Sequence, residues 1–418
     1  MTAGLPHIYD IVGRRAAATP AGTAVSFGDR RWSWRELDDR VRRAAGALRA
    51  AGIGPGDRIA FLDKNHPACL ELTLAASLVG AANAAVNFRL APEELGYVLA
   101  DSGARLVVAG AEFTGALDAL RERRPRVVIL GGERDEYEPL LAAAEPVTEV
   151  YDAGPDDCFL QLYTSGTTGW PKGAMLTQRS MTAHTVMAAR AYGMDAGTVN
   201  VVAMPLFHVG GTSWALGSMY AGGHTVIVRD VVPTAVLDLI EDQSATHAFF
   251  VPAVIQMLLT DPGRARQSLG ALQVLGYGGS PMPAPLMERT LEILPTPLYS
   301  VYGMTELSGV FCALGPPEHR DPGQTALRAF GGPAAAGQRG ADRLRPRTAG
   351  TLQVPGFGPA RRRATAERQR QGAQAQPASQ RRRLMRDPPG QASRVRGNPG
   401  RRRFEVRTAA ARVAQPGR

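Results

Sequence analysis

Residues 163–174 bring together the glycines, hydroxyl groups and positive charge that binding of a phosphate requires. The segment reads Tyr-Thr-Ser-Gly-Thr-Thr-Gly-Trp-Pro-Lys-Gly-Ala. Gly166 and Gly169 lack a Cβ atom, so the backbone can approach an anion closely and can take positive φ. Lys172 supplies a mobile positive charge, and the exposed amides of such a loop form a concavity for anions. Four hydroxyl side chains add donors: Thr164, Ser165, Thr167 and Thr168. We therefore predict a phosphate-binding loop.

The alternative is a flexible polar turn between a strand and a helix, which is the ordinary interpretation of an isolated Gly/Ser/Thr hexapeptide. Here residues 159–163 alternate as a strand and run directly into the loop, whose composition continues over twelve residues. The segment is not the Walker motif, because Trp170 and Pro171 separate Gly169 from Lys172. We favour the phosphate-binding interpretation.

The surrounding sequence alternates helical patterns with short apolar runs, which predicts an α/β domain with largely parallel sheets. Ser33 and Glu36 form a capping box before apolar residues at helical spacing, and Arg58–Leu62 reads as a buried strand. After the phosphate loop, residues 173–190 are compatible with a helix. Further helices are predicted at residues 67–79 and 92–100, and strands at 84–88, 104–108, 200–204, 225–228, 248–251, 273–277 and 298–302.

Three of the later strands end in polar or glycine-rich segments, at residues 205–211, 278–280 and 303–306. In open α/β sheets the ligand crevice lies beyond the carboxyl ends of the strands. We therefore expect the chemistry of this protein at these strand ends.

With the phosphate loop, these segments resemble the signature motifs of the acyl-adenylate-forming superfamily, which includes fatty-acid and aryl CoA ligases, firefly luciferase and the adenylation domains of peptide synthetases. The motifs read Pro-Leu-Phe-His-Val-Gly-Gly at 205–211, Gly-Tyr-Gly-Gly-Ser at 276–280 and Val-Tyr-Gly-Met-Thr-Glu at 301–306. Their order and separation match, and the likeness runs from about Ile8 to Pro322. The sequence around Asn65 and Asn87 looks more like the fatty-acid CoA ligase branch.

The resemblance implies a large N-terminal domain over residues 1–322, incomplete at its C-terminal end, with stacked, mostly parallel sheets flanked by helices. It also implies an ATP-dependent reaction in which a carboxylate, expected to be a fatty acid, forms acyl-AMP and pyrophosphate. Coenzyme A then takes the acyl group as a thioester. ATP, Mg²⁺ and CoA are the expected cofactor and co-substrates.

The motif at 301–306 would bind the nucleotide in such an enzyme. Tyr302 would stack on adenine, with Gly303 and Met304 beside the nucleotide, and Thr305 would bind phosphate. Glu306 would hold Mg²⁺, which prefers carboxylate oxygens next to phosphates. Taken alone, Glu306 in such a turn would be a solvated surface acid, and its pairing with the phosphate loop reverses that interpretation.

The other two motifs would border the acyl pocket, one where it meets the CoA channel and one where it meets the adenine pocket. A lone histidine such as His208 is usually a satisfied core residue, but the resemblance places it where the acyl pocket meets the pantetheine channel. Gly278, Gly279 and Ser280 would line the acyl and adenine pockets, with their missing or small side chains leaving room. Trp214 and Met219 are equally compatible with the acyl pocket and with ordinary core.

Residues 323–418 differ from the rest of the chain in charge and in apolar content. They hold 22 Arg, no Lys and 4 acidic residues, a net of +18, whereas residues 1–322 have a net of −8. Only 11 of these 96 residues are Leu, Val or Phe and none is Ile, which is too few for a core. We predict a disordered tail in place of the small C-terminal domain, whose catalytic lysine it cannot supply.

A shifted reading frame explains much of this tail. Dropping the first base of each codon permits Ser-Val-Gly-Arg-Pro-Leu-Pro-Gly at residues 330–337, a string typical of the family. At residues 361–378 it permits a string that looks like the family's C-terminal end, catalytic lysine included. We hypothesise a frame shift between about residues 315 and 328 together with a deletion. The chain would then be an inactive nucleotide- or acyl-binding fragment.

The competing interpretation of the tail is an arginine-rich nucleic-acid-binding arm. Such arms usually mix lysine with arginine, and lysine is absent here, so we do not expect a nucleic-acid partner.

Cys69, Cys158 and Cys312 are far apart and indicate thiols in a reducing cytoplasm. The apolar run at 70–86 is interrupted by Glu71 and Asn83 and is too short for a bilayer. We expect a cytoplasmic protein with at most peripheral membrane contact.

Overall fold

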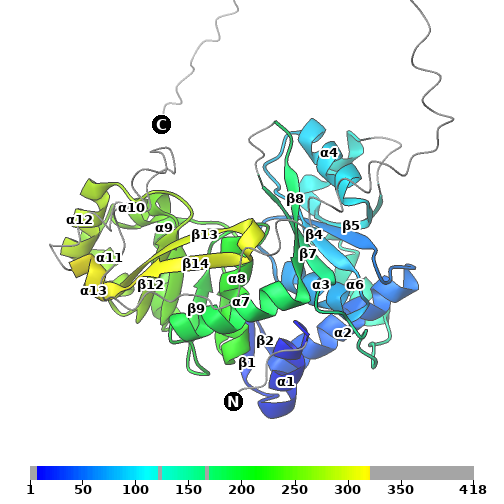
Figure 1. The fold of residues 1–418 in the computed structure, drawn as a ribbon, viewed down its shortest axis with the longest axis horizontal. Coiled ribbons are helices and arrows are strands. Elements are labelled where there is room, and N and C mark those ends of the chain that lie inside the picture. The colour runs from blue at the N-terminus through cyan, green and yellow to red at the C-terminus, as the bar shows by residue number, and fades with distance from the viewer. Residues whose placement is uncertain (1–6, 121–124, 165–168, 321–418) are drawn as a thin grey trace, which may run out of the picture. The chain divides into compact units, whose positions relative to one another are not determined.

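The computed structural model describes residues 7–120, 125–164 and 169–320 (Figure 1). These residues lie within the first of two compact units, Met1–Val354. The second unit, Pro355–Arg418, and the predicted disordered tail at 323–418 lie outside the described residues. The boundary at residue 322, the frame shift and the disorder therefore stay predictions.

The larger sheet has eight strands in the order β14-β13-β12-β11-β9-β10-β1-β2. Its inner pairs are parallel, whereas β2 at one edge and β14 at the other pair antiparallel with their neighbours. The strands are β1 Thr23–Phe27, β2 Arg30–Ser33, β9 Val199–Val202, β10 His224–Ile227, β11 His247–Phe250, β12 Val274–Gly278, β13 Leu298–Met304 and β14 Gly309–Leu314.

The smaller sheet has six strands in the order β6-β5-β3-β4-β7-β8, and only β8 runs antiparallel to its neighbour, β7. The strands are β3 Arg58–Leu62, β4 Ala82–Ala85, β5 Ala104–Gly110, β6 Arg126–Leu130, β7 Cys158–Thr164 and β8 Lys172–Thr177. Two mostly parallel sheets flanked by helices confirm the predicted α/β class.

Helices separate most of the strands, as parallel connections require. In the first half these are α1 Asp10–Ala18, α2 Trp34–Ala50, α3 Pro67–Leu78, α4 Pro92–Ser102, η1 Ala111–Phe113, α5 Thr114–Asp118 and α6 Tyr137–Ala143. In the second half they are α7 Gln178–Ala191, α8 Val209–Ala221, α9 Pro233–Asp242, α10 Pro252–Leu258, α11 Pro262–Gly270, α12 Ala284–Ile293, η3 Thr305–Leu307 and α13 Pro316–Arg320.

One local prediction is wrong, and a second has shifted bounds. Residues 172–177 form strand β8 and not the start of a helix, because their amides and carbonyls pair with β7, with Leu162 opposite Ala174. The helix begins only at Gln178, where Thr177 caps its first turn. The extended segment expected at 84–88 is β4, Ala82–Ala85, which lies between β3 and β7 in the sheet.

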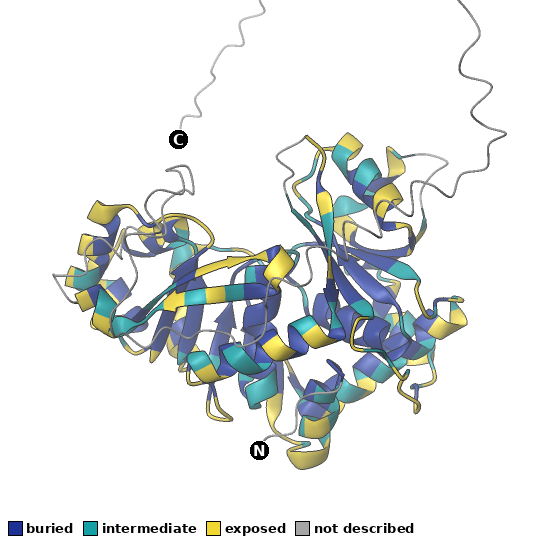
Figure 2. Cartoon of the chain, in the orientation of Figure 1, coloured by how far each residue is buried: buried dark blue, intermediate teal, exposed yellow. Residues whose placement is uncertain are grey.

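The capping box predicted at Ser33 and Glu36 is confirmed, since each side chain accepts a hydrogen bond from the other residue's backbone amide. Helices α3 and α8 are buried on almost all sides, and Figure 2 shows both mainly in the colour of buried residues. Helix α3 and β4 account for the apolar run at 70–86, as expected. No helix among the described residues is both long and apolar enough to cross a membrane.

A buried asparagine joins the strand ends of the two sheets. Asn65 follows β3, and its side-chain amide donates to the carbonyl oxygens of Met204 at 3.0 Å and Val228 at 3.1 Å. Its Oδ1 accepts from the amide of Leu206 at 2.8 Å. The residues it reaches follow β9 and β10 of the other sheet, so one side chain fixes the carboxyl ends of three strands.

Replacing Asn65 with alanine is expected to lower the free energy of unfolding by about 1–3 kcal/mol, because three buried backbone groups lose their partner. The measurement is chemical denaturation followed by circular dichroism. Asn87→Ala is the matched control, since Asn87 is only partly buried and accepts from the nearby Arg89 amide. Equal stability of the two variants would contradict the prediction.

Candidate functional site

The predicted phosphate loop connects two antiparallel strands. Thr164 ends β7 and lies opposite Lys172, which begins β8, and the Thr164 hydroxyl donates to the Lys172 carbonyl at 3.5 Å. Gly169 has a φ of 109°, a backbone conformation that residues other than glycine rarely adopt. Ser165, Gly166, Thr167 and Thr168 lie outside the described residues. The loop is therefore the tip of a hairpin whose base the structure fixes.

Lys172 is available for an anionic ligand. The sequence contains two lysines, and the other, Lys64, is held by Glu112 and Asp230 at 3.2 Å each. The Lys172 side chain is exposed and has no ion pair among the described residues. Lys172 is therefore an exposed positive charge at the base of the hairpin.

The 301–306 motif ends β13 and forms the turn η3. Tyr302 is 48% exposed, and its ring lies 5.2 Å from that of Phe311, which leaves part of the ring open to solvent. A Cβ atom on Gly303 would lie 2.3 Å from the Gly309 carbonyl oxygen, so this glycine permits close pairing of β13 with β14. Met304 and Glu306 are exposed, whereas Thr305 is buried.

The structure brings these two motifs together, although they come from different sheets. Strand β8, which begins at Lys172, contacts η3, which contains Thr305 and Glu306. The hairpin and the turn are therefore neighbours, as a shared nucleotide site requires. This contact was not predictable from the separation of the motifs along the chain.

A magnesium ion at this site would have Glu306 as its protein ligand. No group of three or more His, Cys, Asp or Glu side chains suited to a metal occurs within the described ranges. A single exposed carboxylate beside a phosphate site nevertheless fits Mg²⁺, which usually takes one or two carboxylates together with substrate phosphates and water. Bound there, the ion would neutralise phosphate charge.

The 205–211 motif leads into α8. His208 is the N-cap residue of that helix, and its Nδ1 accepts from the Gly210 amide at 3.1 Å. The ring is therefore held by the helix end and is exposed on its other side. Gly211 passes close to the preceding turn, because a Cβ atom there would lie 2.3 Å from the Pro205 carbonyl oxygen.

Replacing Gly211 with alanine is expected to destabilise the protein by about 1–3 kcal/mol, since rigid backbone atoms oppose the added methyl group. Gly54→Ala serves as the control, because a Cβ atom on Gly54 would meet nothing within 4 Å. Thermal unfolding of both variants measures the effect. A Gly211→Ala variant as stable as Gly54→Ala would contradict the prediction, because it would show that the backbone at Pro205 shifts to accommodate the methyl group.

The 276–280 motif covers β12 and the turn after it. A Cβ atom on Gly278 would lie 2.5 Å from the Val301 carbonyl oxygen, so this glycine makes room for the neighbouring strand β13. Gly279 has a φ of 76° and lines a cavity, and Ser280 is exposed in the turn that follows.

An apolar cavity opens beside these motifs. It includes about 600 Å³ of non-protein space, part of it open to solvent, between α7, α8 and the ends of β12 to β14. Gly279 and Gly303 belong both to its wall and to the nucleotide motifs, and His208 lies on its wall. The other main lining side chains are His184, Tyr192, Met194, Met204, Ser213, Trp214, Phe249, Val301 and Val310.

Trp214 therefore faces the cavity, whereas Met219 is fully buried and does not line it. The α7 residues were not predicted as site residues. His184, Ala188 and Tyr192 follow one another at intervals of four, which places them on one face of a helix. That spacing identifies a shared face, but it does not show that the face meets a cavity.

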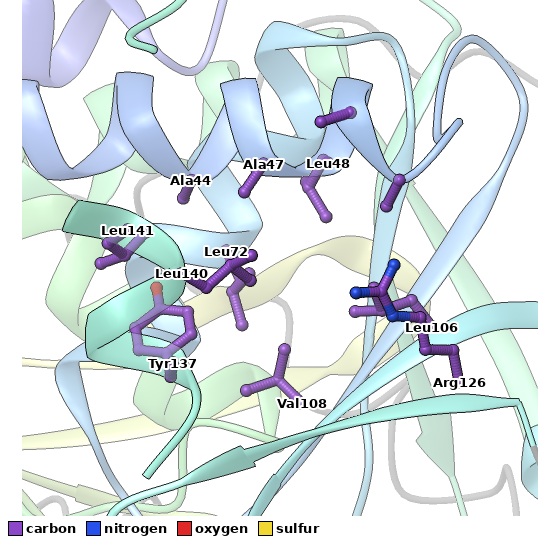
Figure 3. Close-up of a pocket in the computed structure, with 12 residues that line it drawn as sticks. Ala44, Ala47, Leu48, Leu72, Leu106, Val108, Arg126, Tyr137, Leu140 and Leu141 are labelled. Atoms are coloured by element: carbon purple, nitrogen blue, oxygen red, sulfur yellow. The ribbon is translucent and has the colours of Figure 1, made fainter. Parts of the chain in front are cut away.

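A second cavity lies between α2, α6, β5 and β6 (Figure 3). It includes about 590 Å³ of non-protein space, and apolar side chains such as Leu72, Leu106 and Val108 line most of it. Arg126 is at one end. None of the predicted site residues lines this cavity, so we do not include it in the candidate site.

Three histidines make folding sensitive to acid. Burial lowers the pKa of His66, His184 and His224 to about 4, below the ordinary value of 6.5. Between pH 6.5 and 4 the unfolded chain binds protons at these sites and the folded chain does not, so stability falls as the pH is lowered. Imidazole NMR resonances of the folded protein are expected to show three histidines that do not titrate above pH 5. Titration of all seven near pH 6.5 would contradict this.

Comparison with known proteins identifies the family of these motifs. The AMP-binding enzyme family matches residues 12–339. The fatty acid–[acyl-carrier-protein] ligase ScoC of Streptomyces coeruleorubidus is 34% identical over 321 residues, 75% of this chain and 61% of that protein. A feruloyl-CoA synthase from an Amycolatopsis species is 37% identical over 294 residues, 70% of this chain and 58% of that protein.

A solved structure supports the same family assignment. The inhibitor-bound N-terminal domain of FACL13 from Mycobacterium tuberculosis has a TM-score of 0.69 at 26% identity, over 75% of this chain and 80% of that chain. This chain thus spans 58–61% of the length of the two curated relatives. The fold, the sequence motifs and the family match all agree. The chain belongs to the AMP-binding enzyme family, within the acyl-CoA and AMP-forming ligase superfamily.

Proposed function

We propose that the site binds MgATP and a carboxylic acid and catalyses formation of an acyl adenylate, with CoA as the final acyl acceptor. The observation that carries this proposal is the shared wall of two subsites. Gly279 and Gly303 line the apolar cavity and belong to motifs at the ends of neighbouring strands. An acid in the cavity would therefore present its carboxylate next to the phosphates of a nucleotide bound at the hairpin and η3.

In the proposed reaction a carboxylate oxygen attacks the α-phosphorus of ATP. The bond from this phosphorus to the bridging oxygen of pyrophosphate breaks, which gives acyl-AMP and pyrophosphate. Lys172 and the hairpin amides offset the negative charge that builds up on the phosphate oxygens, and the fixed site supplies orientation. A thiolate of CoA would then attack the acyl carbon and release AMP.

His208 and the residues of the 301–306 motif keep their expected roles in this proposal. Tyr302, with its exposed ring, would stack on adenine at the rim formed with Gly303 and Met304. Thr305 would bind phosphate, and Glu306 would hold Mg²⁺. His208, fixed by the helix end and exposed to the cavity side, would position the carboxylate or admit the CoA thiol.

Two classes of carboxylic acid are candidate substrates. A fatty acid is supported by the likeness to ScoC and to the fatty-acid CoA ligase branch, and an aryl acid by the likeness to feruloyl-CoA synthase. Both kinds of acid have an apolar body that the cavity would bury.

The second candidate function is binding of the nucleotide and the acid with little or no catalytic turnover. It is supported by residues 323–418, which contain no lysine to replace the family's C-terminal catalytic lysine. Acid-dependent exchange of labelled pyrophosphate into ATP separates the candidates. Robust exchange with a fatty or an aryl acid supports the enzyme, whereas binding without exchange supports the impaired fragment. Absence of both ATP binding and exchange would refute the proposed site.

A further inference from the structure

Three residues that line the apolar cavity each carry a buried polar atom without a hydrogen-bond partner among the described residues. His184, Tyr192 and Trp214 are 5%, 3% and 5% exposed, respectively. The His184 Nδ1, the Tyr192 hydroxyl and the Trp214 Nε1 make no hydrogen bond within the described part of the chain. All three residues line the cavity next to the nucleotide motifs.

Each of these groups can donate a hydrogen. The His184 Nε2 accepts from the Val310 amide at 2.9 Å, so the proton of the neutral ring is on Nδ1. Burial lowers the pKa of His184 to about 4, which keeps the ring neutral near pH 7. The indole Nε1 of Trp214 is a donor only, and burial keeps the Tyr192 hydroxyl protonated by raising its pKa.

These donors stand in an aromatic wall. The rings of Tyr192 and Trp214 are 5.0 Å apart with an angle of 64° between their planes, and those of Trp214 and Phe249 are 5.6 Å apart. The cavity follows α8 from Gly210 to Gly217, which is roughly 10 Å at the rise of a helix. Trp214 lies about halfway along this length, and His208 caps the helix at its start.

A saturated alkyl chain in this cavity would leave all three donors without a partner, which is unfavourable for buried polar groups. A ligand that carries an oxygen acceptor on its apolar body would satisfy at least one of them, and a flat ring would pack against the aromatic wall.

We propose that the acid is an oxygen-substituted aryl acid, and that Trp214, Tyr192 and His184 select it by donating to an oxygen on its ring. This inference rests on the proposed adenylating function and names the substrate class for the same cavity. The donors are positioning residues for the ring, since none of them is placed next to the reacting carboxylate.

The test uses the full chain and non-hydrolysable acyl sulfamoyl adenosines, which mimic the adenylate without requiring turnover. One pair carries 3-phenylpropenoyl groups with a 4-methoxy or a 4-ethyl substituent, and a second pair carries the same substituents at position 3. Methoxy and ethyl groups have similar shape, but only methoxy accepts a hydrogen bond. An octanoyl analogue represents the alkyl alternative.

The wild-type chain is expected to bind at least one methoxy analogue about three- to tenfold more tightly than its ethyl counterpart and than the octanoyl analogue, as one hydrogen bond provides. Trp214→Phe or Tyr192→Phe is expected to abolish this preference while ethyl binding changes little. Tyr220→Phe is the matched control, because it removes a tyrosine hydroxyl on the same helix that does not line the cavity. Its methoxy preference should be unchanged.

Equal binding of methoxy and ethyl analogues by the wild-type chain, or tightest binding of the octanoyl analogue, would overturn the aryl-acid inference and leave the adenylate site intact. A preference that survives in both Trp214→Phe and Tyr192→Phe would overturn the role of these donors. Failure of every analogue to bind would refute the proposed function itself, and the inference with it.

Discussion

Replacing Lys172 with methionine is expected to weaken the binding of MgATP by about ten- to a hundredfold. Within the described part of the chain the Lys172 ammonium group has no ion pair, and it stands at the base of the predicted phosphate hairpin. A charge-assisted hydrogen bond to phosphate contributes about 1.5–3 kcal/mol. Methionine keeps the length and apolar stem of the side chain, so the strand pairing between Thr164 and Lys172 should persist. Isothermal titration calorimetry measures the Kd.

Lys64→Met removes the other lysine of the chain and is the control for loss of one positive charge. Lys64 is engaged by Glu112 and Asp230, away from the hairpin. Its replacement should leave the Kd for MgATP unchanged. Equal weakening by the two substitutions would show that overall charge, and not the hairpin, determines nucleotide affinity.

Replacing Arg40 with methionine is expected to lower the free energy of unfolding by about 3–5 kcal/mol, the usual consequence of leaving a buried charge without its partner. Arg40 Nε lies 2.6 Å from Glu71 Oε1, and Glu71 is 1% exposed. Its two terminal nitrogens also donate to Glu138 at 2.9 Å each, and the Tyr137 hydroxyl donates to Glu71 at 2.8 Å. Chemical denaturation gives the free energy.

Arg43→Met is the matched control on the same helix. Arg43 pairs with Asp39 at 2.7 Å, and the two side chains are 33% and 49% exposed, so this ion pair contributes at most about 1 kcal/mol. The double variant Arg40→Met with Glu71→Gln should recover part of the loss, because the uncompensated carboxylate is gone. Similar losses for Arg40→Met and Arg43→Met would contradict the account of a buried ion pair.

The fold and the motif positions were predictable because each depends on local sequence. The capping box at Ser33 marks a helix start, and Arg58–Leu62 is a strand with the predicted bounds. Glycine-rich segments after β12 and β13 identified strand ends where a ligand site was expected. These signals operate over a few residues, and tertiary packing did not override them.

The arrangement of the site depends on long-range packing that the sequence does not display. Residues 173–177 were expected to be helical, but they belong to strand β8, because they pair with β7. The contact of β8 with η3 joins segments more than a hundred residues apart. His184, Tyr192 and Trp214, whose donors lack a partner among the described residues, likewise come together only because α7 and α8 meet around one cavity.

The central claim is that the base of an adenylate sits at the rim formed by Tyr302, Gly303 and Met304. Photolabelling of the full chain with 8-azido-ATP and Mg²⁺, followed by peptide mapping, tests it most directly. We expect a label within residues 298–307 that excess ATP prevents. A label that ATP does not prevent, or one confined to residues 323–418, would contradict it.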